Sequence, residues 1–295
     1  MQPHYRDPLP LGDSAGLPYS KGMMARALLA AGVSIDSAYE LATRLELDLI
    51  ATGARAVELE RFEQVAGELL GEEGGNLVVQ RMRGLAALRG LDRPIVLLVG
   101  GATGTGKSTV ATEAAHRLGI TRVTSTDFIR QTIRAYFPAP EMPAVHVSSF
   151  EAGRAGGEME EGFLEQTRSV LVGVEASIER ALNEGWSMAI EGVHLVPGLV
   201  PAEIEGTVLV HAVLRVEDVE EHASHFVIRD ASTGGERPLE KYLQGLAEIR
   251  ALQDLIVERA VRSGVPVIES SSIGHATTSL LDLVLARAGS LEPIA

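Results

Sequence analysis

The sequence contains a glycine-rich stretch, GGATGTGKST at residues 100–109, whose residue types and order are those of a phosphate-binding loop. The apolar run PIVLLV precedes it and VATEAAHRLG follows, so we predict a loop between a strand and a helix. Glycines let successive main-chain N–H groups turn toward a phosphate, and the helix adds its positive end. We therefore assign phosphate binding to Gly101, Ala102, Thr103, Gly104, Thr105, Gly106, Lys107, Ser108 and Thr109.

Two side chains of this loop suit phosphoryl transfer. Lys107 is placed to contact the outer phosphates, and Ser108 is placed to hold Mg²⁺. The chain has only three lysines and otherwise uses arginine, yet the loop keeps the compact ammonium group that suits phosphate. The alternative is a flexible loop without a chemical role. The complete motif between a strand and a helix favours binding of ATP and Mg²⁺.

Asp127 follows the second predicted strand, in TSTDFIRQTIR. Ligands of a parallel α/β sheet lie at the carboxyl ends of its strands, so we expect this carboxylate to accept the proton of an attacking hydroxyl group. Capping of the following helix is the alternative for Asp127. Arg130 and Arg134 lie on one face of that helix and are candidates for binding an anionic substrate, whereas solvated helix charges are their alternative.

Glu191 closes the apolar strand SMAIEG. A carboxylate in that place holds the metal ion or its water in many phosphate-transferring enzymes, so we predict that Glu191 and Ser108 are the metal ligands. Gly192 lets the backbone pass close by. His194 lies nearby, as a catalyst or as a buried histidine with satisfied hydrogen bonds.

A further cluster of cations flanks a stretch rich in Ser, Thr and Gly near residues 228–241. This composition is typical of a lid that closes over a transferring phosphoryl group, with a solvated loop as the alternative. We predict catalytic roles for Arg229 and Arg237 beside Lys107 and Asp127, and a substrate contact for Lys241.

The elements that must position these residues form two parts. Four helical segments occupy the first 90 residues, the third ending at the glycine pair Gly74 and Gly75. Further on, a proline- and glycine-rich loop precedes a helix over residues 158–183, and another helix covers residues 239–262. Five segments with strand character alternate with helices after Arg93 and imply a parallel sheet with helices on both faces: PIVLLVG, ITRVTST, WSMAIEG, TVLVHAVLR and VPVIES.

Composition narrows the function classes. The formal charge of −14 opposes nucleic-acid binding, which needs a basic face. Without cysteine, a metal must be held by oxygen or histidine ligands. No apolar stretch is long enough for a membrane span and the first residues lack a signal-peptide pattern, so we expect a cytoplasmic protein that does not bind membranes.

The motifs together resemble the 2-phosphoglycerate kinase family. The resemblance covers most of residues 17–270 and rests on PYSKGMMARALLAAG, RPIVLLVGGATGTGKST, TSTDFIR, AIEGVHLVPG, HASHFVIR and YLQGLAEIRALQDLIVERA, in the order of the family. It implies an α/β P-loop kinase with a parallel five-stranded sheet flanked by helices, over residues 91–295. A small, mostly helical ATP-cone-like domain over residues 1–90 precedes it.

The resemblance further implies transfer of the ATP γ-phosphoryl group to 2-phosphoglycerate, giving 2,3-bisphosphoglycerate. The expected partner is thus a small phosphorylated acid, and a homo-oligomer is left open. Two alternatives remain at this point: a P-loop kinase for another small hydroxyl substrate, and a nucleotide-sensing regulator without turnover.

Overall fold

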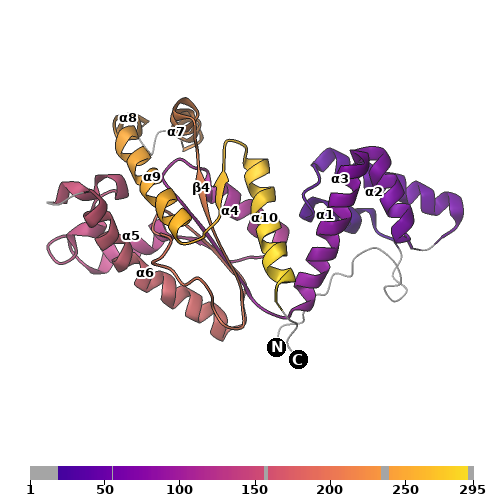
Figure 1. Ribbon diagram of the computed structural model, residues 1–295, viewed down its shortest axis with the longest axis horizontal. Coiled ribbons are helices and arrows are strands. Elements are labelled where there is room, and N and C mark those ends of the chain that lie inside the picture. The colour runs from indigo at the N-terminus through magenta and orange to yellow at the C-terminus, as the bar shows by residue number, and fades with distance from the viewer. Residues whose placement is uncertain (1–18, 55, 156–158, 234–238, 292–295) are drawn as a thin grey trace. The chain divides into compact units, whose positions relative to one another are not determined.

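The computed structural model describes residues 19–54, 56–155, 159–233 and 239–291. The chain divides into two compact units. The first contains the residues up to Asp92 together with those from Val284 onward, and the second runs from Arg93 to Leu283. Figure 1 shows helices in the first unit and a sheet with flanking helices in the second.

The N-terminal part of the first unit is helical over its described residues, as the sequence predicts. Ser34 caps the second helix, since its side chain accepts a hydrogen bond from the main-chain N–H of Ser37. Large apolar side chains such as Met24, Leu41 and Phe62 are fully buried and form its core. The helices are α1 (Lys21–Ala30), α2 (Ile35–Thr52) and α3 (Leu59–Gly90).

The predicted helix boundary at Gly74 and Gly75 is wrong. α3 continues through both residues and is interrupted instead at Gly71, where φ is 79° and ψ is 160°. A Cβ on Gly75 would lie 2.8 Å from the main-chain nitrogen of Gly67, so the backbones on the two sides of this break approach closely. The glycines therefore allow close approach within α3 and do not end it.

The second unit contains a five-stranded sheet in the order β2-β3-β1-β4-β5, and all its paired strands are parallel. This confirms the sheet that the sequence predicts, and each strand overlaps one of the five apolar segments. The central strand β1 is the most apolar and pairs with β3 on one side and β4 on the other, which fits its complete burial. The strands are β1 (Ile95–Gly101), β2 (Val123–Ser125), β3 (Met188–Glu191), β4 (Val208–Arg215) and β5 (Val267–Glu269).

Helices cover both faces of this sheet (Figure 1). On one face, Val96 and Leu98 of β1 join a core cluster with the apolar side of α6, where Val170, Val174 and Ile178 are all buried. On the other face α4 contacts β1 and β3. The helices of this unit are α4 (Lys107–Leu118), α5 (Thr126–Tyr136), α6 (Met159–Asn183), α7 (Val219–Thr233), α8 (Leu239–Gln244), α9 (Leu246–Arg262) and α10 (Ile273–Gly289), whose last residues belong to the first unit.

Two details differ from the sequence-based expectation. The predicted loop before α6 contains two short 3₁₀ helices, η1 (Pro143–His146) and η2 (Ser149–Ala155). The predicted helix over residues 239–262 is interrupted at Gly245, where a Cβ would lie 2.7 Å from the Phe150 ring. The contact between η2 and this break is a tertiary feature, which helical periodicity does not reveal.

Over the described ranges, no helix is both long and apolar enough to cross a membrane.

Candidate active site

The loop between β1 and α4 depends on glycine backbone geometry. Gly101 has φ 134°, and a Cβ on it would lie 2.4 Å from the carbonyl oxygen of Leu214. Gly104 and Gly106 also have positive φ, at 87° and 76°. Side-chain-bearing residues rarely adopt these values, so the conformation of this loop requires glycine at these three positions.

The main-chain N–H groups of this loop are candidate donors to a ligand. Within the residues that the structure describes, the N–H groups from Thr103 to Thr109 donate to no other group of the chain. Those of Lys107, Ser108 and Thr109 belong to the first turn of α4. The N–H groups in the first turn of a helix have no acceptor within the helix. Unpaired donors at the positive end of a helix dipole form a binding site for an anion.

Lys107 and Ser108 extend from this helix start. The Lys107 ammonium is buried and donates a 2.5 Å hydrogen bond to the carbonyl oxygen of Ala102. Burial lowers the pKa of Lys107, while the carboxylates of Glu191 and Asp127 act in the opposite direction. Ser108 Oγ donates to Glu191 Oε1 at 2.9 Å. The structure therefore brings both predicted metal ligands together beside the loop.

Asp127 and Arg130 form an ion pair in the first turns of α5. Both Nε and Nη2 of Arg130 lie 3.2 Å from Asp127 Oδ1, and the side chain of Asp127 is 51% exposed. Ser125, and not Asp127, caps α5 by accepting a hydrogen bond from Phe128 N–H. The capping alternative for Asp127 is therefore wrong, and its half-exposed carboxylate has an oxygen available to a ligand.

The Arg130 guanidinium is already heavily bonded. Besides its contacts with Asp127, Nη1 donates to the carbonyl oxygens of Val145 and Val147, at 3.0 and 2.8 Å. An arginine has five N–H donors, and these contacts leave one on Nη2. In this arrangement Arg130 does not present a two-pronged fork to a substrate.

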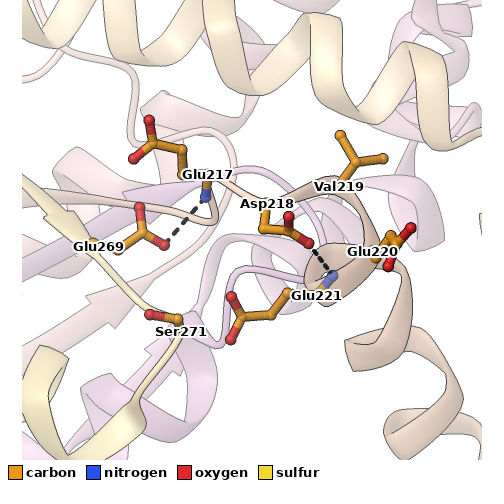
Figure 2. Close-up of a pocket in the computed structure, with 7 residues that line it drawn as sticks. All are labelled: Glu217, Asp218, Val219, Glu220, Glu221, Glu269 and Ser271. Carbon is orange, nitrogen blue, oxygen red and sulfur yellow. Dashed lines mark hydrogen bonds between the residues drawn. The ribbon is translucent and has the colours of Figure 1, made fainter.

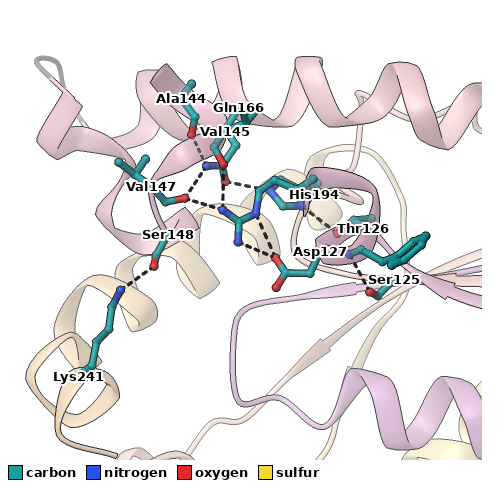
Figure 3. A network of polar contacts seen from close by, with 12 residues as sticks. Ser125, Thr126, Asp127, Ala144, Val145, Val147, Ser148, Gln166, His194 and Lys241 are labelled. Carbon is teal, nitrogen blue, oxygen red and sulfur yellow. Dashed lines mark hydrogen bonds and ion pairs between the residues drawn. The ribbon is translucent and has the colours of Figure 1, made fainter. Parts of the chain in front are cut away.

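A buried hydrogen-bond chain runs beside this pair (Figure 3). Gln166 Nε2 donates to the carbonyl oxygens of Ala144 and Val147, so its Oε1 faces His194 Nε2 as an acceptor at 2.9 Å. His194 Nε2 must then carry the proton, and Nδ1 accepts from Thr126 Oγ1 at 2.8 Å. The chain thereby links α6, η1 and the residue before Asp127.

His194 is a neutral, fully bonded residue. Burial lowers its pKa to about 3, with the Arg130 and Lys107 charges acting in the same direction and the Asp127 charge opposing them. Its two ring nitrogens are both engaged, which favours the structural alternative over a catalyst. Gly192 lets this segment approach α5, since a Cβ there would lie only 1.9 Å from Thr126 Oγ1.

The other four cationic residues predicted for the site belong to segments after the first turns of α5. Lys241 pairs with Glu151 at 2.8 Å and donates to Ser148 Oγ at 2.9 Å, so it joins α8 to η2. Arg134 is exposed in the last turn of α5. Arg229 is part of α7, and Arg237 lies outside the described residues. Of the two whose side chains the structure describes, Arg134 and Lys241, only Lys241 has a contact with another described side chain.

Sequence reasoning missed three residues that contact these elements. Gln166 looks like one more polar position of a long helix, and only tertiary structure brings it to His194. His222 and His225 of α7 contact the carbonyl oxygens of Thr103 and Gly104. Their spacing of three residues places both on one helical face, and this is the signal from which they could have been found.

An acidic cavity of about 560 Å³ lies near the carboxyl ends of β4 and β5 (Figure 2). Its polar lining is held in place by the main-chain N–H of Glu217, which donates to Glu269, and that of Glu221, which donates to Asp218. Carboxylates repel a phosphorylated acid, so this cavity does not fit such a ligand. The full lining is Glu217, Asp218, Val219, Glu220, Glu221, Glu269 and Ser271.

Buried neutral histidines make stability depend on pH. Burial lowers the pKa of His211 to about 4, although its bond to the carbonyl of Leu195 acts the other way, and His194 titrates lower still. Below about pH 6.5 the unfolded chain takes up protons that these folded residues refuse, so stability falls with pH. We expect the unfolding free energy to drop by about 2 kcal/mol for each histidine between pH 7 and pH 5.

Urea unfolding of the parent, His211→Gln and the exposed-site control His116→Gln at pH 7, 6 and 5 measures this effect. His211→Gln should lower the number of protons taken up on unfolding near pH 5 by close to one, so the unfolding free energy should depend less steeply on pH. His116→Gln should leave this slope unchanged. An unfolding free energy independent of pH over this range would contradict the burial argument.

The fold and site together define a class of protein. A parallel sheet with a glycine-rich loop after its central strand, a buried lysine and carboxylates at neighbouring strand ends is the arrangement of an α/β phosphotransferase. Comparison with known proteins is consistent with this class, although no protein-family model matches the chain.

Curated relatives match the chain over nearly its whole length. It is 34% identical over 275 residues to the 2-phosphoglycerate kinase of Methanopyrus kandleri, covering 91% of this chain and 84% of the relative. It is 34% identical over 281 residues to that of Pyrococcus horikoshii, covering 93% and 92%. It is 35% identical over 271 residues to the 2-phosphoglycerate kinase of Thermococcus kodakarensis, covering 90% of this chain and 92% of the relative. The chain belongs to the 2-phosphoglycerate kinase family, which confirms the resemblance found in its motifs.

Proposed function

We propose that this protein transfers the γ-phosphoryl group of ATP to the free hydroxyl of 2-phosphoglycerate, forming 2,3-bisphosphoglycerate and ADP. The relatives described above are named for this activity. The structural observation that carries the proposal is the row of N–H groups from Thr103 to Thr109, around the start of α4, that have no partner among the described residues. Such donors suit the phosphates of a nucleotide, and the loop acts as a P-loop.

The site also has room for the rest of the nucleotide. A pocket of about 580 Å³ adjoins the loop, and Ser108, Thr109, Ile273 and Gly274 contribute to its lining. This volume is within the usual range for sites that hold small molecules. We assign the nucleoside of ATP to this pocket and its phosphates to the loop.

The donors near the loop fit Mg²⁺. Ser108 and Glu191 supply two oxygen atoms, and Mg²⁺ in kinases takes its other ligands from phosphates and water. In the part of the chain that the structure describes, no group of three or more His, Asp or Glu side chains forms a complete protein cage. When bound, the ion would neutralise charge that develops on the phosphates, while Ser108 and Glu191 hold it in place.

Asp127 is the proposed base on the acceptor side. Its half-exposed carboxylate accepts the proton of the attacking hydroxyl, whose oxygen forms the new bond to phosphorus as the bond to ADP breaks. Arg130 orients this carboxylate and retains one N–H for the acid. Lys107 stabilises the migrating group, with Arg229 and Arg237 as proposed lid contributors and Arg134 and Lys241 as further anion contacts.

The two domains predicted from the sequence have different proposed roles. We assign phosphoryl transfer to residues 91–295, including a lid near residues 228–241. We assign a regulatory or assembly role to residues 1–90, as an ATP-cone-like domain. The support for this division is that the loop, Asp127 and Glu191 all belong to the second compact unit.

Purified protein incubated with labelled ATP, Mg²⁺ and a panel of acceptors tests the function. The panel contains 2-phosphoglycerate, 3-phosphoglycerate, glycerate, a sugar acid and a nucleoside. We expect label in 2,3-bisphosphoglycerate, with 2-phosphoglycerate as the fastest acceptor. Faster phosphorylation of a neutral acceptor would indicate another small-molecule kinase, and ATP binding without turnover of any acceptor would indicate a nucleotide sensor.

A further inference from the structure

Helix α7 contacts the outer side of the phosphate loop through two histidines. His222 Nε2 lies 2.8 Å from the carbonyl oxygen of Thr103, and His225 Nδ1 lies 2.8 Å from that of Gly104. A carbonyl oxygen only accepts, so each of these ring nitrogens carries a proton and donates. Two neighbouring carbonyl groups of the loop are thus held by donors from one helical face.

These carbonyl groups are directly connected to the anion-binding donors. The Thr103 carbonyl shares its peptide unit with Gly104 N–H, and the Gly104 carbonyl shares its unit with Thr105 N–H. Neither N–H has a protein partner within the described residues. A donor on the carbonyl polarises the peptide unit and strengthens its N–H as a donor. It also resists rotation of the unit, because rotation would break the histidine contact.

Apolar contacts fix His222 in this role. Its ring stacks on Phe226, with centroids 5.5 Å apart, and Phe226 approaches so closely that a Cβ on Gly104 would lie 2.6 Å away. His222 Nδ1 is buried and has no partner among the residues that the structure describes, and burial lowers the pKa of the ring. The ring is therefore neutral at pH 7 with its single proton on Nε2, directed at the loop.

We propose that His222 and His225 are positioning residues that hold the peptide units between Thr103 and Thr105 in the orientation that binds the phosphates of ATP. This inference rests on the proposed function, since it assumes that the loop binds a nucleotide. It predicts that both histidines affect the affinity for phosphates and leave the affinity for the acceptor acid unchanged.

Paired substitutions separate the hydrogen bond from the shape of the ring. His222→Phe and His225→Leu remove the donors, and His222→Phe keeps a ring to stack on Phe226. His222→Gln and His225→Asn return an N–H near the position of the lost Nε2 and Nδ1. The exposed residue His116 provides the control His116→Gln. Calorimetry measures binding of ATP with Mg²⁺ and of inorganic tripolyphosphate, and steady-state assays give KM for 2-phosphoglycerate.

We expect each donor-removing variant to weaken ATP and tripolyphosphate binding about three- to tenfold, the usual worth of one hydrogen bond. The Gln and Asn variants should stay within about twofold of the parent, and KM for the acid should change by less than about twofold. Unchanged binding in both donor-removing variants would overturn the proposal, as would equal losses in the donor-removing and donor-returning variants. If His222→Phe does not fold, as judged by circular dichroism, His225→Leu and His225→Asn decide alone.

The same experiment separates this proposal from the proposed function. A parent protein that binds neither ATP nor tripolyphosphate would overturn both. A parent that binds ATP with the expected histidine dependence, but phosphorylates no phosphoglycerate, would refute the assigned substrate and support the role of the histidines.

Discussion

Lys107→Met is expected to lower kcat by at least about 100-fold, the usual consequence of removing one preorganised charge that stabilises a transition state. The methionine keeps a straight side chain in the buried space but cannot contact the migrating phosphoryl group. Lys107 donates only to the carbonyl of Ala102 among the described residues, so its ammonium is available to phosphates. Turnover of 2-phosphoglycerate under saturating ATP measures the effect.

The chain offers a matched control for this variant. Lys21 lies in α1 of the first unit and pairs with Glu46 at 3.1 Å on the surface, so Lys21→Met should leave kcat within about twofold. Circular dichroism and thermal unfolding establish that Lys107→Met is folded. A folded Lys107→Met protein with kcat within about tenfold of the parent would exclude the proposed role of Lys107.

Asp127→Asn is expected to lower kcat by about 10² to 10⁴, the usual contribution of a general base, with little change in either KM. The amide keeps the shape of the side chain and one oxygen for Arg130, but it does not accept the hydroxyl proton. The partners of Arg130 at Val145 and Val147 are untouched, which should preserve this part of the fold. Initial rates over a matrix of ATP and 2-phosphoglycerate concentrations separate kcat from the two KM values.

Asp254→Asn provides the control, because Asp254 is an exposed carboxylate on α9. It should change kcat by less than about twofold. If Asp127→Asn instead raised KM for the acid and left kcat unchanged, Asp127 would bind the substrate and another group would accept the proton.

Tertiary structure revised the predictions that depend on side-chain partners. From the helical spacing, Arg130 is a candidate fork for an anion, yet all but one of its donors are occupied by Asp127 and by the carbonyl groups of Val145 and Val147. His194 likewise has two alternatives in the sequence, and the orientation of Gln166 decides between them. Partners that are tens of residues apart leave no periodic signal, so spacing along one helix does not show whether a polar side chain is free.

Local patterns were sufficient for the features that depend on neighbouring residues. The glycine positions of the loop, the run of apolar residues in β1 and the turn to α4 are properties of one short stretch, because positive φ values require glycine and a short apolar run between turn residues is typical of a strand. The five strands similarly follow from apolar segments of strand length, which is why the five-stranded sheet was predicted correctly. The predicted alternation with helices fails between β3 and β4, which are joined without a helix.

The sequence by itself determined the family, the parallel sheet and the residues that could do chemistry at the strand ends. Only the tertiary structure decided which polar groups are occupied, as Arg130 is, and which are unpaired, as the loop N–H groups are over the described residues. It also decided that two histidines of α7 contact the loop. The physical reason is that a hydrogen bond requires two groups within about 3 Å, and the fold, rather than the local sequence, brings distant groups to that distance.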